Sequence, residues 1–318
     1  MNYRNILGAL LLTAAPAFAS DGPYAPAISA KSVFTEVASG ETLHAIESGK
    51  GNPVVFLHGL PSSAYLWRDV LPIVGKSAHA IAPDLPGYGY SDVPSNGGRD
   101  LTALGSVLDH YLDGLPDDKM VLVVNDVGSL LGLNYAVHKP ERIAGIVLVE
   151  AVFQPPQDFM AQLRPDHLEF LQAVQDPAVV SSLTIDQPAL VDMAIQSNTA
   201  TELGEDILSN YRAPYMPGQK DHLAKREVLA ATFGPDGGAT FGMIAAENAA
   251  GLTELDVPIL LIEADPGYMV NPPAIAYAKE HFKNLTISKV SGAMHFVSED
   301  QPVALGDAIN AWLSDIGF

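Results

Sequence analysis

Short apolar runs alternate with helical patterns through the first half of the chain. The runs predict strands over Val33–Val37, Leu43–Glu47, Pro53–Leu57, His79–Pro83, Val121–Val124 and Ile143–Val149. Helical patterns separate the later runs, over Ala64–Val74, Asp100–Leu115 and Ser129–His138. Strands that alternate with helices form a mainly parallel sheet with helices on both faces. The pattern therefore predicts an α/β fold.

This alternation stops after Phe153 and returns only near residue 257. Between these points the chain is helical in character, and it is interrupted by several prolines and by the glycine-rich residues 234–238. Strands then follow at Val257–Glu263 and Leu285–Val290, with helices at Pro273–His281 and Val303–Ile316. We therefore expect a core formed by residues 20–153 and 251–318, into which a helical cap of residues 154–250 is inserted.

The strand Val121–Val124 runs into a helix through the polar corner Asn125-Asp-Val-Gly128. A buried strand that enters a helix through a sharp turn is the geometry of a nucleophile elbow. The usual elbow carries Ser, whereas this one carries Asp126. A carboxylate in that place attacks an electrophilic carbon and leaves an ester on the protein.

Other titratable side chains follow the later strands. Glu150 ends the strand after the elbow, Asp265 follows another strand, and His295 follows the last one. Ligands of open α/β sheets bind outside the carboxyl ends of the strands, so these residues are expected near Asp126. A histidine can deprotonate the water that hydrolyses the ester. Either Glu150 or Asp265 can orient this histidine, and we favour Glu150 because a buried carboxylate needs a partner.

Composition narrows the possible ligands. The chain is 48% hydrophobic and carries a formal net charge of −20, which argues against nucleic acid and anionic membranes as partners. It contains no Cys, so it forms neither disulfides nor thiolate metal sites. The histidines outside the candidate site show no metal-ligand spacing, and no cofactor or metal is expected.

The N-terminus has the features of a secretory signal. Arg4 precedes the apolar run Ile6–Ala15, and Ala17 and Ala19 are the small residues that a signal peptidase recognises. The run is too short to span a bilayer. We therefore expect a signal peptide over residues 1–19, no membrane anchor, and a mature protein that is periplasmic or secreted.

Several motifs, spread over the whole predicted core, resemble those of known enzymes. They are His58–Arg68, Asp84–Ser91, Asn125–Gly128, Pro140–Ile143, Asp265–Gly267 and His295–Asp300. Together they resemble the haloalkane dehalogenases, their Renilla-luciferase-like relatives and the Asp-nucleophile epoxide hydrolases. The chain order of acid nucleophile, acid and histidine is also that of α/β-hydrolases. The resemblance implies an α/β-hydrolase fold and weakens across residues 154–250.

Carried over position by position, the resemblance implies a role for each residue. Asp126 matches the nucleophile, His295 the base and Glu150 the orienting acid, while Asp265 matches the acid position of other family members. Backbone N–H groups of Leu60 and Val127 are expected to bind the oxyanion. The implied partners are a small apolar organic substrate and water, and the oligomeric state is left open.

Members of this family differ in the leaving group of the reaction and in the residues that stabilise it. Haloalkane dehalogenases hold the departing halide with a Trp directly after the nucleophile and an Asn after the His-Gly pair, or a Trp of the cap. Here those positions are Val127 and Leu60, and residues 153–250 contain no Trp. We therefore favour an epoxide hydrolase, whose ring-opening acids are expected among Tyr211, Tyr215 and His167. The alternatives are a haloalkane dehalogenase-like hydrolase and a non-catalytic ligand-binding homologue.

Overall fold

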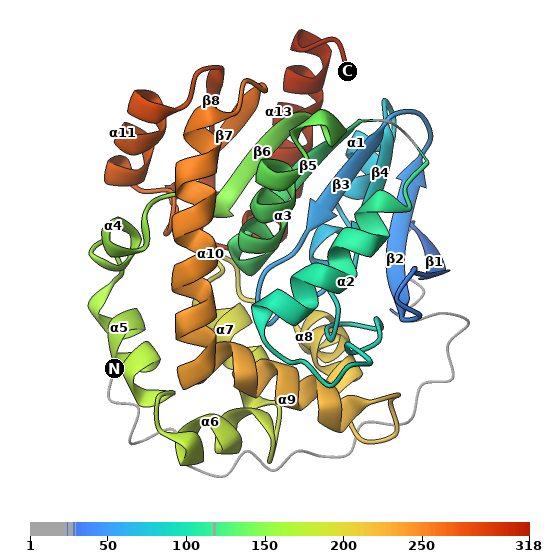
Figure 1. The fold of residues 1–318 in the computed structure, drawn as a ribbon, viewed down its shortest axis with the longest axis vertical. Coiled ribbons are helices and arrows are strands. Elements are labelled where there is room, and N and C mark those ends of the chain that lie inside the picture. Colours follow the sequence, from blue (N-terminus) through green and yellow to red (C-terminus); the bar gives the residue numbers. More distant parts are fainter. Residues whose placement is uncertain (1–23, 25–27, 29, 117–118) are drawn as a thin grey trace.

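A computed structural model describes residues 24, 28, 30–116 and 119–318. The predicted signal peptide therefore lies outside the described residues. The central feature is an eight-stranded sheet with the order β1-β2-β4-β3-β5-β6-β7-β8 (Figure 1). Its strands are β1 (Lys31–Glu36), β2 (Thr42–Gly49), β3 (Pro53–Leu57), β4 (His79–Pro83), β5 (Met120–Asn125), β6 (Ile143–Ala151), β7 (Ile259–Pro266) and β8 (Leu285–Ala293).

The pairing of the strands confirms the α/β prediction. β1 and β2 pair antiparallel with each other and β2 pairs antiparallel with β4, whereas the strands from β4 to β8 are parallel. Every residue of β3 and β5 is buried. Such strands need cover on both faces of the sheet, and this requirement explains their continuous apolar sequence.

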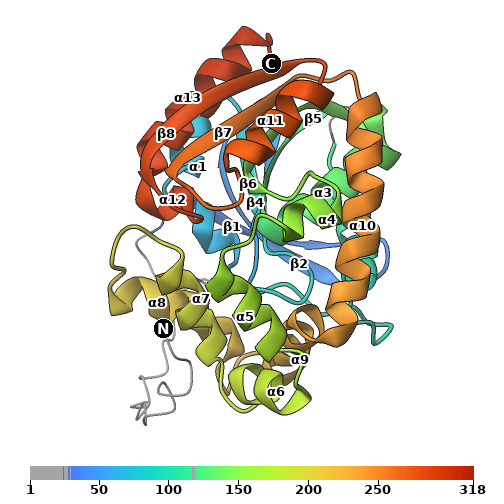
Figure 2. The ribbon, with the colours of Figure 1, turned by 90° about the vertical axis from the view of Figure 1, so that its left-hand side faces the viewer.

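Helices cover both faces of the sheet (Figures 1 and 2). On one face α2 (Leu101–Asp113), α3 (Asp126–His138) and α10 (Pro235–Glu254) pack side by side. The other face carries α1 (Leu71–Val74) and α13 (Pro302–Asp315), which contact each other. Next to the last strands lie α11 (Pro272–His281) and α12 (Val297–Asp300).

The helix predicted over Ala64–Val74 is not continuous. The chain forms the short 3₁₀ helix η2 (Ala64–Trp67) and then the separate single turn α1. Pro72 lies in the first turn of α1 and has no N–H to donate to the carbonyl of Arg68. A proline is tolerated in a first turn but not inside a helix, so the pattern breaks before it.

The segment between β6 and β7 is helical, as expected. It contains α4 (Pro156–Met160), α5 (Pro165–Ala173), α6 (Pro177–Thr184), α7 (Ala189–Ser197), α8 (Glu205–Arg212), η4 (Ala213–Tyr215), α9 (His222–Phe233) and α10. Several of the prolines that interrupt the sequence pattern stand at the starts of α4, α5, α6 and α10. A proline suits the first helical position because its missing N–H has no partner there.

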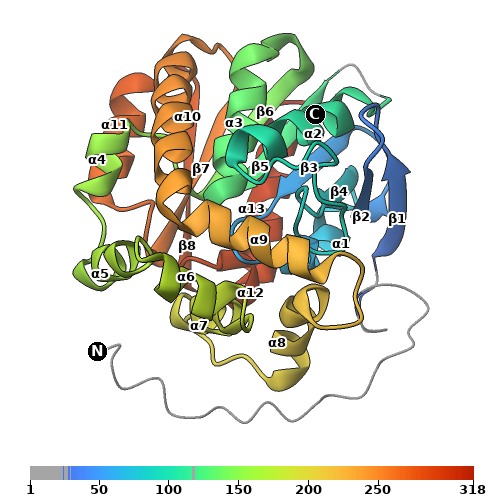
Figure 3. The same cartoon turned by 60° about the horizontal axis from the view of Figure 1, so that its bottom comes forward.

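These helices lie at one end of the sheet, with α5 to α9 spread across it (Figure 3). We refer to residues 154–234 as the cap helices. The predicted end of the cap at residue 250 falls inside α10, which runs on to Glu254 and packs along α3. No single helix in the described part of the chain is long and apolar enough to cross a bilayer, although α6 and α7, bent by 89° at their junction, reach that threshold as a pair.

A buried carboxylate joins the first strands to the loops that follow them. Asp84 accepts hydrogen bonds from the Tyr24 hydroxyl at 2.6 Å, and from the N–H groups of Ala64 at 2.7 Å and Tyr90 at 2.8 Å. The Nδ1 atom of His44 lies 2.7 Å from the same carboxylate. Burial alone raises the pKa of Asp84, but the hydrogen bond and the charge of His44 outweigh burial, so the pKa lies below its usual value.

Replacing Asp84 by Asn is expected to lower the free energy of unfolding by about 3 kcal/mol or more, because one member of a buried pair is removed. Since the folded pKa is depressed, this stabilisation is present above the unfolded pKa of about 3.9 and is lost as the pH falls through the folded pKa. Urea unfolding at pH 7 and at lower pH measures both effects. The exposed Asp315→Asn variant should stay within about 0.5 kcal/mol of wild type. Equal stability of the two variants would contradict the expectation.

Candidate active site

The junction of β5 and α3 has the geometry of the predicted elbow. Asn125 ends the strand in an extended conformation, and Asp126 begins the helix with φ +47°. A positive φ is unusual for a residue other than glycine, and it turns the chain sharply. Two residues on, a Cβ atom at Gly128 would lie 2.4 Å from the His58 carbonyl oxygen. The close approach of α3 to the end of β3 therefore requires glycine at this position.

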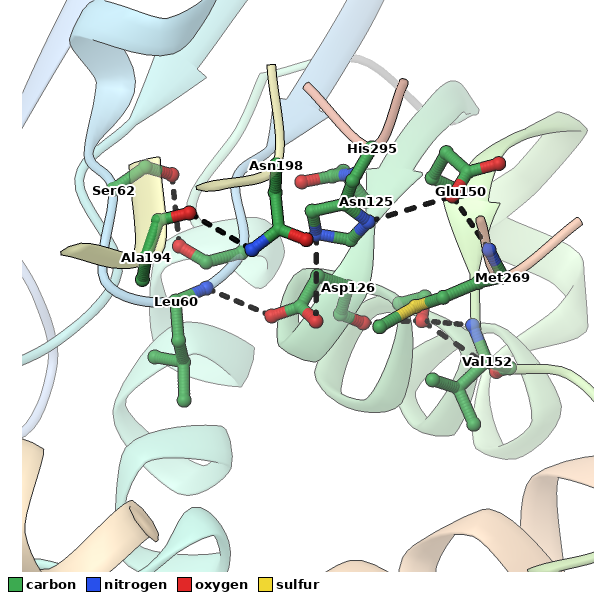
Figure 4. Close-up of polar contacts among 12 residues, drawn as sticks. Leu60, Ser62, Asn125, Asp126, Glu150, Val152, Ala194, Asn198, Met269 and His295 are labelled. Carbon is green, nitrogen blue, oxygen red and sulfur yellow. Dashed lines mark hydrogen bonds and ion pairs between the residues drawn. The ribbon is translucent and has the colours of Figure 1, made fainter. Parts of the chain in front are cut away.

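Hydrogen bonds hold the elbow against the end of β6 (Figure 4). The side-chain amide of Asn125 donates to the Val149 carbonyl at 3.1 Å. The Ser129 hydroxyl donates to the Asp126 carbonyl and accepts the N–H of Val152 at 2.8 Å. These contacts bring the ends of β5 and β6 together, and so they place Asp126 and Glu150 in the same region.

The loop after β3 supplies a hydrogen-bond donor to Asp126. The backbone N–H of Leu60 donates to Asp126 Oδ1 at 2.8 Å (Figure 4). The N–H of Val127 lies in the first turn of α3, where no preceding helical carbonyl is available to it. Leu60 thus meets the geometric requirement for an oxyanion donor, and the role of Val127 stays a prediction from its position.

The His295 ring lies between the two carboxylates. Its Nε2 atom is 3.7 Å from Asp126 Oδ2, and its Nδ1 atom is 3.5 Å from Glu150 Oε2. The His295 side chain is 5% exposed and that of Asp126 16% exposed. Both separations are longer than ordinary hydrogen bonds. The arrangement places a base beside one oxygen of Asp126 while Leu60 holds the other oxygen.

Glu150 is positioned by its own backbone and by the loop after β7. It has φ +46°, its side chain is fully buried, and it accepts the N–H groups of Met269 at 2.6 Å and Val270 at 3.3 Å. These two donors fix the orientation of the carboxylate. The Glu150 carboxylate can accept a hydrogen bond from the Nδ1–H of His295 and so orient the ring.

Asp265 does not lie with these residues. Its side chain is 55% exposed and lies 3.0 Å from the Lys289 ammonium group. Glu263 also faces Lys289, at 3.9 Å. Alternate residues of a strand point to the same side, so Asp265 shares the outer side of β7 with Glu263. The expectation that Asp265 follows its strand into the site is corrected: the structure brings Glu150, and not Asp265, to His295.

The two predicted cap tyrosines differ in the partners of their hydroxyl groups. The Tyr211 hydroxyl donates to Glu299, which also binds Arg68. The Tyr215 hydroxyl is buried, and it has no hydrogen-bond partner within the described residues. Burial raises its pKa far above the usual value. The structure therefore pairs the Tyr211 hydroxyl with Glu299, whereas the role of Tyr215 as a ring-opening acid stays a prediction.

His167 is the predicted cap residue that lies near the site. Burial lowers its pKa, while the Asp126 carboxylate raises it and the His295 ring lowers it further. Its ring centroid is 5.3 Å from that of Tyr268. A lowered pKa keeps the ring neutral at pH 7, so His167 can act as a polar but uncharged group near the site.

Tyr268 is a site residue that the sequence reasoning missed. It follows Gly267 in the loop after β7, and its ring centroid is 6.1 Å from that of His295. The Arg164 guanidinium lies 4.5 Å from the ring centroid on the cap side. The Tyr268 hydroxyl is buried, and within the described residues it has no hydrogen-bond partner. Burial raises its pKa, so the hydroxyl remains a donor at neutral pH.

A signal for Tyr268 was present in the sequence. Asp265-Pro-Gly267 follows a strand of the parallel sheet, and the next residue therefore enters the loops where ligands bind. A small void beside Tyr268 is lined by both apolar and polar side chains, those of Phe159, Gln162, Leu163, Met269 and Asn271. As for metals, no group of three or more His, Asp or Glu residues within the described ranges is arranged to hold a metal ion.

Comparison with known proteins places this geometry in a family. Residues 52–302 match the family model of the α/β hydrolase fold. The chain is 30% identical over 280 residues to a haloalkane dehalogenase of Mesorhizobium japonicum. This alignment covers 86% of the present chain and 89% of the relative. The chain is 33% identical over 290 residues to a haloalkane dehalogenase of Sphingobium indicum, covering 88% and 94%.

Solved structures agree with the sequence relatives. A haloalkane dehalogenase from Agrobacterium tumefaciens superposes with a TM-score of 0.80 at 26% identity, covering 90% of this chain and 97% of that one. One from Bradyrhizobium elkani gives a TM-score of 0.81 at 27% identity, covering 91% and 99%. These relatives favour the dehalogenase alternative over the epoxide hydrolase that the sequence reasoning preferred. The chain therefore belongs to the α/β-hydrolase superfamily and, within it, to the group of the haloalkane dehalogenases.

Proposed function

We propose that this protein hydrolyses small halogenated alkanes through an alkyl ester on Asp126. The observation that carries the proposal is the different environment of the two Asp126 oxygens. Oδ1 accepts the Leu60 N–H at 2.8 Å, while Oδ2 faces His295 Nε2 at 3.7 Å. The names of the relatives supply the substrate class.

In the first step, Oδ2 of Asp126 attacks the carbon that bears the halogen. The new C–O bond forms as the carbon–halogen bond breaks, and the halide leaves with the bonding electron pair. A carboxylate is already ionised near neutral pH, so this step needs no base. Oδ1 remains on the Leu60 N–H and becomes the carbonyl oxygen of the ester.

In the second step, His295 takes a proton from water, and the resulting hydroxide adds to the carboxyl carbon of Asp126. Negative charge develops on Oδ1, where the Leu60 N–H is already in place, together with that of Val127 by its position. Each such donor contributes about 3 kcal/mol of transition-state stabilisation. Collapse of the intermediate releases the alcohol, which takes up the proton held by His295, while Glu150 keeps the imidazolium in orientation. The second proton of the water stays on the Asp126 carboxyl group and is then lost to solvent, which restores the carboxylate.

The halide leaves without the side-chain donors that other members of the group use. Val127 and Leu60 occupy those two positions and offer no side-chain N–H. Chloride concentrates its charge more than bromide or iodide does, and its bond to carbon is stronger. Loss of a donor to developing charge reduces a rate by about 10²-fold or more. Chloroalkanes are therefore expected to be the poorest substrates.

Halide release from 1-chloro-, 1-bromo- and 1-iodoalkanes of equal chain length tests the proposed function. We expect bromide and iodide release to exceed chloride release by about 10²-fold or more in kcat/KM, as measured by ion chromatography. A Leu60→Asn variant keeps the backbone N–H and adds an amide donor, so it should raise chloride release more than iodide release. Absence of halide release across the panel, with diol formed from epoxides instead, would reject the dehalogenase proposal.

A further inference from the structure

The loop that carries His295 is held on both sides of the catalytic histidine. The Met294 N–H donates to Asp300 Oδ2 at 2.9 Å. The Phe296 N–H donates to the Asn198 carbonyl at 3.2 Å. One of these two acceptors belongs to α12 and the other to the cap, so the orientation of the His295 backbone depends on both.

Asp300 extends this connection into the cap. Its carboxylate accepts the N–H of Ala200 with both oxygens, at 2.9 and 3.0 Å, and the N–H of Thr201 at 2.9 Å. Together with Met294, three backbone N–H groups converge on one side chain. The carboxylate thus joins residues 198–201, which follow α7, to the loop that carries His295.

The residue before Asp300 makes a separate connection. Glu299 has a side chain that is 1% exposed, and it binds the Arg68 guanidinium at 2.7 Å and the Tyr211 hydroxyl. These contacts join α12 to η2 and to α8. Residues 198–201 therefore dock on a segment that is itself firmly attached to the core, and Asp300 provides the link that reaches the neighbour of His295.

The cap segment contacts the residue that follows the catalytic histidine, since the Asn198 carbonyl accepts the Phe296 N–H. Asn198 is itself held by its side-chain amide, which donates to the Ala194 carbonyl at 2.9 Å (Figure 4). The contact between His295 and Glu150 holds the ring only loosely, because the Nδ1 atom lies 3.5 Å from Glu150 Oε2. A misplacement of about 1 Å in a reacting group reduces a rate by about 10²-fold. The orientation of the His295 ring is thus sensitive to the backbone hydrogen bonds that hold the loop on either side of it.

We propose that Asp300 is a positioning residue that aligns His295 for water activation by fixing cap residues 198–201 to the histidine loop. The inference rests on the proposed function, since it concerns the hydrolysis of the Asp126 ester. Asp126 and Leu60 lie on other elements, and attack on the substrate needs no base. Loss of the Asp300 link should therefore slow ester hydrolysis and leave ester formation nearly unchanged.

Asp300→Asn tests this directly, because both carboxylate oxygens accept N–H groups and Asn keeps only one acceptor oxygen. Its NH₂ group cannot accept the N–H groups that the other oxygen binds. Rapid-quench mass spectrometry with a bromoalkane measures ester formation and ester hydrolysis separately. We expect hydrolysis to slow by about 10²-fold, with formation within about threefold of wild type. The alkylated enzyme should then accumulate during turnover. Asp307→Asn, on the exposed side of α13, is the matched control and should behave as wild type.

A second variant leaves Asp300 in place. Thr201→Pro removes one N–H donor to the carboxylate and should slow hydrolysis in the same direction but by less. Equal slowing of both steps in the two variants, or no slowing of either step, would overturn the inference while the proposed function stands. If the wild-type enzyme forms no ester with any haloalkane, the proposed function fails, and this inference falls with it.

Discussion

Replacing His295 by Gln is expected to leave the protein alkylated on Asp126 after a single turnover. Ester formation needs only the ionised carboxylate and a bound substrate, whereas hydrolysis needs the Nε2 atom that lies 3.7 Å from Oδ2. Removing a catalytic base of this kind reduces kcat by about 10⁴-fold or more. Intact-protein mass spectrometry should show one added alkyl group, and halide release should stop at one equivalent per protein.

Asp126→Ala is the matched control, because it removes the attacking oxygens and leaves His295 and Glu150 in place. It should give neither adduct nor halide. Peptide mapping of the His295→Gln adduct must locate the alkyl group on Asp126. Continued turnover by His295→Gln, or an adduct on another residue, would contradict an ester intermediate that His295 hydrolyses.

The oxygen of the product gives an independent check of the same mechanism. If water adds to the carboxyl carbon of Asp126, the new oxygen stays on the enzyme after one turnover. A single turnover in ¹⁸O-labelled water should therefore label Asp126 and not the alcohol. Label in the alcohol would instead mean that water attacks the substrate directly, with Asp126 as a base.

Replacing Glu150 by Gln is expected to have the second-largest effect on turnover. Glu150 is fully buried, it lies 3.5 Å from His295 Nδ1, and two backbone N–H groups hold its carboxylate. The amide cannot stabilise the imidazolium or select the correct ring tautomer. Loss of the corresponding acid in a Ser-His-Asp enzyme lowers kcat by about 10⁴-fold, and we expect a loss of 10²- to 10⁴-fold here.

Asp265→Asn provides the comparison for Glu150→Gln. Asp265 is 55% exposed and faces Lys289, so its replacement should change kcat by less than about twofold and stability by less than about 0.5 kcal/mol. Steady-state halide release by the two variants shows whether Glu150 or Asp265 is the acid that orients His295. A large loss in Asp265→Asn together with a small loss in Glu150→Gln would overturn the assignment made from the geometry.

The predictions that succeeded rest on local physical constraints. A run such as Val121–Val124 is apolar on both sides, and only a strand covered on both faces buries such a run. The elbow could be recognised because the strand, the polar corner and the glycine at position 128 follow one another directly. The starts of α4, α5, α6 and α10 coincide with prolines because proline suits a first helical turn.

The predictions that failed concern distances between segments far apart in the chain. Tyr211 was a reasonable acid by its place in the cap, but its hydroxyl binds Glu299, 88 residues later. Asp265 follows the expected strand, yet the alternation of side chains turns it toward Lys289. Tyr268 and His167 meet only because α5 packs over the loop after β7, and nothing local in either stretch indicates this contact.

The amino-acid sequence by itself determined the order of strands and helices, the elbow with Asp126, and the set of acids and histidine that follow the strands. These features depend on residue type and on spacing along the chain. Only the tertiary structure decided that Glu150 faces His295, that Tyr268 lines the site, and that Asp300 links the cap to the histidine loop. The reason is that the direction of a side chain and its partners depend on packing between distant segments, which a single sequence does not specify.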